Sequence, residues 1–283
     1  MTTAHAAHSS LPGLAIGNGL GSIAVQTAFL AVADFAYRQG NLEHAAASVA
    51  NLLNAFLLIV ILAVVLLATM TTDMAIGHIS PMSIAIFAIY MFGLKLAQNT
   101  IHSPMWRPVR NEVTKAENQE KYGRASQNRT SRLIGHFIAH GTVLVASGFL
   151  LSHIGGSLSE RFGLPDTLVG ASVTGLITSL PELVTTVAAV RQGALVLAVS
   201  NIVGGNTFDS LFVAVGDLFY IPGPIYRGAT VQDQFLMGLS ILLTAVLGAG
   251  LVVRQRRDWS GIGFESIAML VIYGLGMTMM FLL

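Results

Sequence analysis

The chain of 283 residues contains no cysteine, which excludes disulfides, thiol catalysis, iron–sulfur clusters and cysteine-based zinc sites. Charged residues are also scarce, at 10% of the chain against about 25% in an ordinary soluble domain. A net charge of +1 gives no basis for nucleic-acid binding or for a broadly acidic partner. Neither H-E-x-x-H nor G-x-S-x-G occurs, so we expect no enzyme and no resident cofactor.

Apolar residues are abundant, at 53% of the chain with a mean hydropathy of +0.69. Stretches long enough to cross a hydrocarbon core, about 20 residues each, occur at 13–36, 46–69, 80–102, 133–155, 165–191, 194–220, 231–253 and 263–283. The first ten residues carry no lysine or arginine, so they do not resemble a cleaved signal peptide. The sequence therefore predicts an all-α polytopic membrane protein with about eight transmembrane helices in the lipid bilayer.

Basic residues predict how the chain is oriented in the membrane. If the polar loop 103–132 is cytoplasmic, alternation of the spans places twelve of the 15 lysines and arginines on that side. They are Arg38, Arg107, Arg110, Lys115, Lys121, Arg124, Arg129, Arg132, Arg191, Arg254, Arg256 and Arg257. Because basic residues concentrate on the cytoplasmic side, we expect a multi-pass protein of the cytoplasmic membrane with loop 103–132 inside the cell.

An internal repeat appears when the chain is aligned with itself. An offset of 183 residues aligns residues 2–37 with 185–220, and polar identities such as Asn18/Asn201 and Asp34/Asp217 fall in one register. The predicted spans run in opposite directions in the two copies, which is the inverted arrangement of many secondary transporters. We therefore expect a remnant of a first repeat half at 1–102 with three spans, the basic loop at 103–132, and a second half at 133–283 with five spans.

The segment before the second copy contains a proline and a carboxylate inside a span. Pro181 predicts a helix break near Thr178–Glu182. A break inside a membrane exposes backbone groups that protein, water or an ion must satisfy. Thr178, Ser179 and Glu182 would then supply oxygen atoms there. The first copy begins at Met1, aligned with Val184, and so has no counterpart of Glu182.

The returning helix brings a second carboxylate. Asn206 and Asp209 lie three residues apart on one face, next to the pair Gly204 and Gly205, which predicts close helix approach. Carboxylates in hydrocarbon are costly unless they are protonated, paired or bound to a cation. The alternative is that both acids are neutral and satisfied by nearby polar groups. Oxygen-rich ligands suit Na⁺, Ca²⁺ or protons better than zinc or copper.

Two further groups of residues have expected structural roles. Gly13, Gly17 and Gly21 recur at intervals of four and predict a close helix-packing face. Four acidic residues lie towards span ends, and we expect them at the membrane interface. They are Asp34, Asp217, Asp233 and Glu265.

Two segments carry a resemblance to a known family. Ile177-Thr178-Ser179-Leu180-Pro181-Glu182 and Ser200-Asn201-Ile202-Val203-Gly204-Gly205-Asn206-Thr207-Phe208-Asp209 resemble the second alpha-repeat of the calcium/cation antiporter superfamily, the sodium/calcium exchanger group. That repeat pairs G-T-S-L-P-E with G-N-x-x-G-S-N-x-x-[ND]. The resemblance implies that Glu182 and Asp209 are cation ligands, including any metal ion. It also implies that Thr178, Ser179 and Asn206 line the ion path.

The first repeat is less similar to the family pattern. The segment from Gly17 to Gln26 keeps its opening, but Ile23 replaces the expected Asn and Gln26 takes the final ligand position. The resemblance implies a ten-helix plan, of which eight spans are expected here without the first two. It further implies antiport of cations (Na⁺, Ca²⁺ or H⁺) by alternating access, with Gln26 and Asn18 lining the opposite half-site.

The alternative function is a degenerate, non-transporting membrane subunit with a structural or regulatory role. Intact Pro181, Glu182 and Asp209 oppose this alternative, whereas Ile23 favours it. Assembly into a homo-oligomer is left open.

Overall fold

A computed structural model describes residues 2–37, 40–46, 48–71, 74–102, 130–253 and 263–283. Within these ranges the chain is helical, and its only β pairing is an isolated bridge between Ile76 and Ile79. Eight of the described helical segments are long and apolar enough to span a membrane: Pro12–Tyr37, Val49–Met70, Pro81–Thr100, Ile134–Phe162, Asp166–Arg191, Leu195–Phe219, Val231–Val253 and Phe264–Leu282. The predicted polytopic fold and its eight spans are confirmed, while most of loop 103–132 lies outside the described residues.

The helices follow one another with short connections. Before the loop they are α1 (Thr2–His8), α2 (Pro12–Tyr37), α3 (Leu42–Ala45), α4 (Val49–Met70) and α5 (Pro81–His102). After the loop they are α7 (Thr130–Phe162), α8 (Asp166–Val169), the π-helical turn η1 (Gly170–Thr174), α9 (Gly175–Arg191), α10 (Leu195–Asp209), α11 (Leu211–Phe219), the 3-10 turn η2 (Ile225–Gly228), α12 (Val231–Val253) and α13 (Phe264–Leu282).

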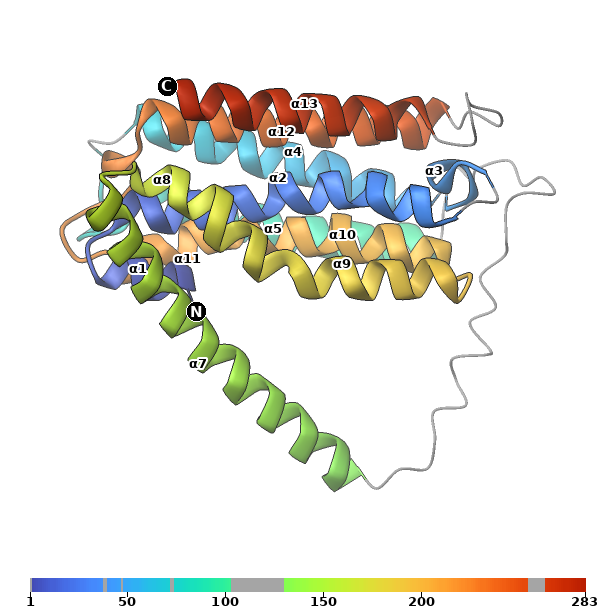
Figure 1. Cartoon of the computed structure of the whole chain (residues 1–283), viewed down its shortest axis with the longest axis horizontal. Coiled ribbons are helices and arrows are strands. Elements are labelled where there is room, and N and C mark those ends of the chain that lie inside the picture. The colour runs from blue at the N-terminus through green and yellow to red at the C-terminus, as the bar shows by residue number, and fades with distance from the viewer. Residues whose placement is uncertain (1, 38–39, 47, 72–73, 103–129, 254–262) are drawn as a thin grey trace.

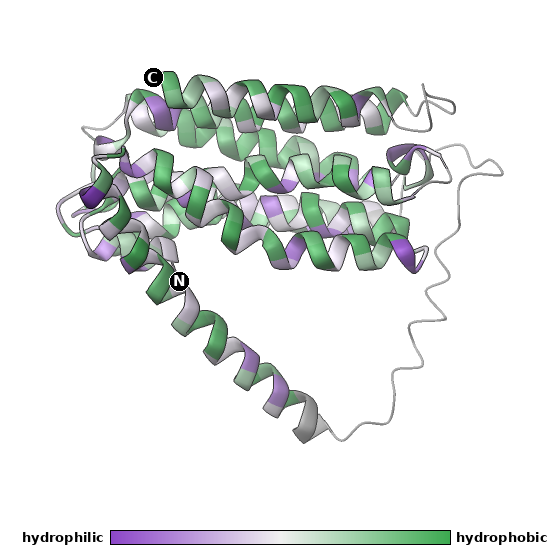
Figure 2. Ribbon diagram, in the orientation of Figure 1, coloured by the Kyte–Doolittle hydropathy of each residue, from purple (hydrophilic) through white to green (hydrophobic). Residues whose placement is uncertain are grey.

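Helix α2 forms the centre of the bundle, and nearly all of its side chains are buried. It packs against α9 and α10 on one side and against α12 and α13 on the other (Figure 1). The outer helices are largely hydrophobic along their length (Figure 2), which suits a lipid environment. The N-terminal half of α7 diverges from the other helices (Figure 1), and its side chains are exposed.

Glycines on α2 allow the segment from α8 to α9 to approach it closely, as the sequence predicted. A Cβ added to Gly17 would lie 2.5 Å from the carbonyl oxygen of Thr167. A Cβ on Gly21 would overlap the backbone of Ala171, lying 2.8 Å from its carbonyl oxygen. The backbones therefore meet with no room for a methyl group, as is common where membrane helices pack through small residues.

The inverted repeat is evident in the paths of the helices. Helix α2 runs from the end of the molecule near α1 to the end near α3, whereas α10 and α11 run the opposite way (Figure 1). Near the end of α2, Asp34 accepts hydrogen bonds from the Leu42 amide (2.8 Å), the Gly263 amide (3.0 Å) and the Ser266 hydroxyl (2.9 Å). Asp34 thereby joins α2 to α3 and to the first turn of α13. We call this arrangement the Asp34 clamp.

The repeat counterpart of Asp34 makes the same set of bonds at the opposite end. Asp217 accepts from the Ile225 amide (2.7 Å), the Ser80 amide (2.8 Å) and the Ser83 hydroxyl (2.7 Å), joining α11 to η2 and α5. Every partner in this Asp217 clamp lies 183 positions from its equivalent in the Asp34 clamp. The repeat therefore extends beyond the aligned segments and includes α5 and α13.

The position of four acidic residues at the membrane interface stays a prediction, but the structure shows that their side chains are buried within the protein. Asp34, Asp217, Asp233 and Glu265 are 0–1% exposed. The two clamps give the reason, because amide groups at helix starts, which lack partners within their own helix, compensate for the desolvation of the carboxylates. Asp233 is satisfied similarly by the Thr230 amide (2.8 Å) and the Thr167 hydroxyl (2.8 Å), which links α12 to α8.

Candidate cation-binding site

Most of the predicted ion-binding residues from both repeats surround one cavity of about 640 Å³. Six helices contribute to its walls, namely α1, α2, α7, α9, α10 and α11, and most of the polar side chains come from α1, α2, α9 and α10. These are Thr2, Thr3, Asn18, Ser22, Gln26, Thr178, Glu182, Asn201 and Asp209. The remaining wall is mainly apolar and comes largely from α7, with Leu144, Leu151, Ile154 and one hydroxyl, that of Ser147. The cavity therefore combines an oxygen-rich wall with a mainly apolar one.

The predicted helix break at Pro181 was wrong in its position. Helix α9 continues through Pro181, and the irregularity lies earlier, in the π-helical turn from Gly170 to Thr174. A side-chain hydroxyl bonds backbone carbonyls in this region: that of Thr178 donates to the carbonyls of Thr174 (2.9 Å) and Gly175 (3.1 Å). These bonds lie in the turn before Pro181, whose missing amide would otherwise bond the carbonyl of Ile177. Pro181 itself lines the cavity beside Glu182.

Helix α2 provides the amide that joins the two halves of the site. The Gln26 side-chain nitrogen donates to Asp209 Oδ2 (2.9 Å) and to the Ser179 hydroxyl (3.2 Å). One turn earlier, the Ser22 hydroxyl lies 3.2 Å from that of Thr178. Gln26 and Asp209 are repeat counterparts, 183 residues apart, so this contact lies at the axis that relates the repeats.

Helix α10 ends at Asp209, where Ser210 separates it from α11. Asp209 faces the cavity, whereas Asn206 is buried against α2 and donates to the Thr27 hydroxyl (2.9 Å). The structure therefore brings Glu182, Asp209, Thr178, Gln26 and Asn18 to the cavity wall. It places Ser179 and Asn206 behind that wall, in contact with α2.

The buried polar atoms of the site show an imbalance between acceptors and donors. Four oxygens have no hydrogen-bond partner among the described residues: Asn18 Oδ1, Gln26 Oε1, Glu182 Oε2 and Asn206 Oδ1. All four are acceptors. A buried acceptor without a donor costs about 1–3 kcal/mol, so the site favours a species that donates hydrogen bonds or carries positive charge. No group of three or more histidine or acidic residues gathers as a metal site in the described ranges. Further protein ligands beside the two carboxylates would be side-chain amide, hydroxyl or backbone carbonyl oxygens.

The glycine pair on α10 does not form the close helix contact expected of it. A Cβ on Gly204 would meet nothing within 4 Å in the described structure, and one on Gly205 would lie 3.7 Å from Gln26 Oε1. Gly204 is the repeat counterpart of Gly21, which η1 covers. The two faces differ because none of the described segments packs on Gly204 as η1 packs on Gly21.

Sequence reasoning missed several polar residues that line the cavity, among them Thr2, Thr3, Ser22 and Asn201. The side-chain amide of Asn18 donates to the Thr3 hydroxyl (3.1 Å). Its counterpart Asn201 donates to Thr186, the counterpart of Thr3, at 2.9 Å. The identities at offset 183 contained this signal, because both members of each pair are the same residue type.

Comparison with known proteins agrees with this geometry. A profile of the sodium/calcium exchanger protein family matches residues 132–282, more than half of the chain. Sodium/calcium exchanger MaX1 of Methanosarcina acetivorans is 31% identical over 105 residues, which are 37% of this chain and 29% of that protein. Inner membrane protein YrbG of Escherichia coli is 34% identical over 90 residues, 32% of this chain and 28% of that protein. The matched stretches thus cover less than a third of these relatives.

Solved structures share the fold along almost the whole chain. The H⁺/Ca²⁺ exchanger CAX superposes with a TM-score of 0.65 at 14% identity, covering 99% of this chain and 72% of that one. Native YfkE gives a TM-score of 0.63 at 18% identity, covering 100% and 79%. These likenesses establish the inverted-repeat transporter fold, and the profile match establishes the lineage. The chain belongs to the sodium/calcium exchanger protein family.

Proposed function

We propose that the chain performs secondary active cation transport by antiport, and that Glu182 and Asp209 bind the transported cation. The observation that carries the proposal is a set of three buried acceptor oxygens at the cavity, on Asn18, Gln26 and Glu182, for which the described residues provide no hydrogen-bond partner. A cation in the cavity would satisfy these three acceptors together with the Asp209 carboxylate. Hard cations such as Na⁺, Ca²⁺ or a proton suit oxygen ligands of this kind.

The inverted repeat supplies the conformational basis for alternating access. Gln26 on α2 and Asp209 on α10 lie at the axis between halves of opposite direction. Rocking or gating of one repeat against the other around such a fixed site exposes it to either side of the membrane in turn. The proposal places the protein in the cell membrane with loop 103–132 in the cytoplasm, as the distribution of basic residues favours.

Cation-driven flux in proteoliposomes tests the proposal. Glu182→Gln keeps the shape of the side chain and removes its charge, and we expect it to abolish exchange. Glu160→Gln makes the same change on an exposed residue of α7 outside the cavity, and it should retain wild-type flux. Wild-type flux in Glu182→Gln would refute the assigned role.

The non-transporting alternative is favoured by one observation. Asp209 faces the neutral Gln26 instead of a second acid, so the half-site on α2 offers no carboxylate. Cation-dependent thermal stabilisation, measured together with flux, distinguishes a transporter from a non-transporting subunit. A bound ligand stabilises the folded state by about 2.7 kcal/mol at 100 times its Kd. Stabilisation that is lost in Asp209→Asn, together with absent flux, would identify a cation-binding subunit that does not transport.

A further inference from the structure

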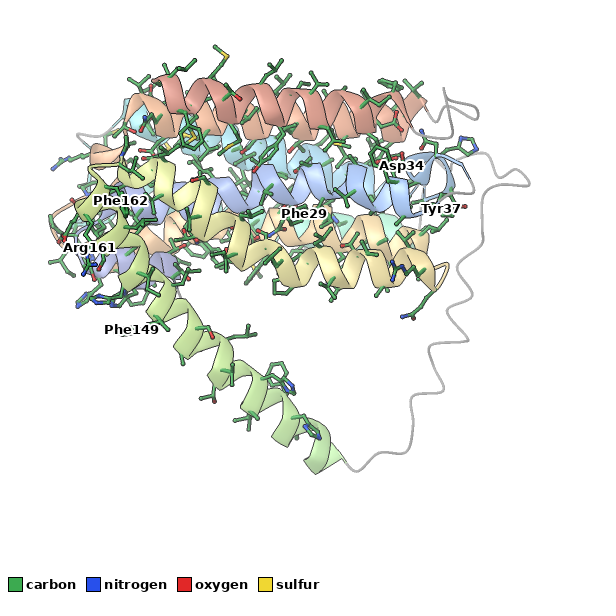
Figure 3. All side chains as sticks on the ribbon, viewed as in Figure 1. Phe29, Asp34, Tyr37, Phe149, Arg161 and Phe162 are labelled. Carbon is green, nitrogen blue, oxygen red and sulfur yellow. The ribbon has the colours of Figure 1, made fainter. Side chains whose placement is uncertain are left out.

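The two clamps are alike in their hydrogen bonds but differ in the residues beside them. At offset 183, Glu43 corresponds to Tyr226 and Glu265 corresponds to Met82. The Asp217 clamp is thus completed by neutral groups, with the Tyr226 hydroxyl 2.9 Å from that of Ser83. The Asp34 clamp is completed by two additional acids. Figure 3 labels Asp34 and Tyr37 at this end of the molecule, far from Arg161 at the other.

The three acids lie on three different helices and are completely buried. Glu43 on α3 is 0% exposed, and Asp34 on α2 and Glu265 on α13 are each 1% exposed. The side-chain amide of Asn41 donates to Glu265 Oε1 at 2.5 Å. A Cβ on Gly250 would lie 2.6 Å from Glu265 Cγ, and one on Gly263 would overlap both Glu265 and Asn41. The space around Glu265 therefore depends on glycines from α12 and from the start of α13.

Glu43 is the unusual member of the group. Both of its carboxyl oxygens are buried and have no hydrogen-bond partner among the described residues. Asp34, in contrast, accepts three bonds from α3 and α13. An isolated carboxylate in such a place is far more costly than a neutral carboxylic acid. The side chain therefore needs a positively charged ligand, and the smallest is a proton.

Several of the elements around Glu43 carry ionisable groups near it. They are Asp34 and Tyr37 on α2, His44 on α3 and Glu265 on α13, while the described parts of α10 and α12 that face α3 contribute none. Arg38 and Arg254, Arg256 and Arg257 adjoin these elements in sequence and lie outside the described residues. Burial, followed by the nearby Asp34 and Glu265 carboxylates, raises the pKa of Glu43 well above its usual value.

We propose that Glu43 and Glu265 form a proton-binding site, separate from the central cavity, in which one bound proton holds α3 against the first turn of α13. The proton removes the repulsion between the two carboxyl groups and allows one to donate to the other. Its loss weakens the Asp34 clamp. The Asp217 clamp has no such dependence, because burial raises the pKa of Tyr226 and keeps its hydroxyl neutral. The fold thus has a proton-sensitive end and an insensitive end.

The sign of the pH effect follows from linkage. Below the ordinary glutamate pKa, about 4.3, folded and unfolded chains both hold the proton and the contribution to stability is complete. Above that value the unfolded chain loses the proton while the folded chain keeps it, so the unfolding equilibrium constant rises about tenfold per pH unit. The loss of stability ends only when pH passes the raised pKa of the folded state.

Infrared spectroscopy of the purified full chain tests proton binding directly. We expect a carbonyl band of a buried carboxylic acid at neutral pH that shifts in D₂O and disappears in Glu43→Gln. Tyr226→Phe, the matched change at the other clamp, should retain the band. Spectra that are the same for wild type and Glu43→Gln at every pH would overturn the proposal. So would a band that is absent at neutral pH while added Na⁺ or Ca²⁺ stabilises the wild type but not Glu43→Gln.

Thermal unfolding measured against pH gives an independent test. Relative to wild type, Glu43→Gln should become more stable as pH rises, by about 3–5 °C in Tm per pH unit within the window. The difference between wild type and Tyr226→Phe should stay constant. If Glu43→Gln does not fold, Glu265→Gln replaces it, and the carboxylic acid band should then titrate at a lower pH than in the wild type. A constant Tm difference for Glu43→Gln, or an unmoved band in Glu265→Gln, contradicts the shared proton.

Discussion

A single methyl group should have opposite effects at two equivalent positions of the repeat. Gly21 on α2 and Gly204 on α10 are repeat counterparts in helices, so replacing either with alanine gains about 1 kcal/mol of helix propensity. They differ in what the methyl group meets. At Gly21 it would overlap the backbone of Ala171, with the carbonyl oxygen at 2.8 Å, whereas at Gly204 it meets nothing within 4 Å in the described structure.

The magnitude follows from the packing of α2 against η1. Backbone atoms cannot rotate away as a side-chain end can, so Gly21→Ala must push η1 and α9 away from α2. Overpacking of this kind costs about 1–3 kcal/mol and occasionally more. Since the gain in propensity is common to both variants, the difference between them isolates the packing cost. We expect Gly21→Ala to unfold about 2–12 °C below Gly204→Ala.

Thermal unfolding of the two variants in detergent, monitored by the loss of tertiary structure, measures the difference in Tm. Gly204→Ala should equal or slightly exceed the wild type. Cation-dependent stabilisation should also weaken in Gly21→Ala, since α9 carries Glu182 and Thr178. Equal Tm values for the two alanine variants would refute the close backbone contact between α2 and η1.

Other predictions concern the clamps and the cavity. Asp217→Asn puts an amide opposite three donors, and we expect a loss of about 1–3 kcal/mol, measured as a lower Tm; an unchanged Tm would show that the clamp contributes nothing. Ser83→Ala should cost less, about 1 kcal/mol, because Asp217 keeps two amide donors. Gln26→Glu replaces the donor to Asp209 with a like charge, so its Tm should fall in cation-free buffer at pH 8 and recover with Ca²⁺. A variant that Ca²⁺ fails to rescue would show that the cavity holds no divalent ion.

Much of the architecture was accessible from the sequence for identifiable reasons. The spans follow from hydropathy, because lipid leaves few alternatives to long apolar helices. The repeat was detectable because polar identities such as Asn18/Asn201 are uncommon in membrane helices and occur in one register. In repeat transporters the substrate site lies where the repeats meet, so we expect Glu182 and Asp209 at one cavity. The structure places both there.

Other features depended on tertiary context that a sequence does not display. The π-helical turn before α9 arises where that segment meets α2, so the position of Pro181 alone gave the wrong place for the irregularity. The openness at Gly204 depends on what packs there, which local sequence does not determine. Glu43 lies on a four-residue helix between spans, too short for any periodic pattern. Its complete burial became apparent only from the packing of α3 among longer helices.

The bond between Gln26 and Asp209 has a consequence for how the two halves can diverge. Most positions in a duplicated chain meet a different position in the other copy, but a residue at the axis meets its own duplicate. Two aspartates there would repel whenever no ion lay between them, and two glutamines would offer an ion no charge. A donor on one side and an acid on the other avoids both outcomes. Asymmetry at this pair therefore lets the duplicated scaffold remain stable when empty and, under the proposed function, still attract a cation.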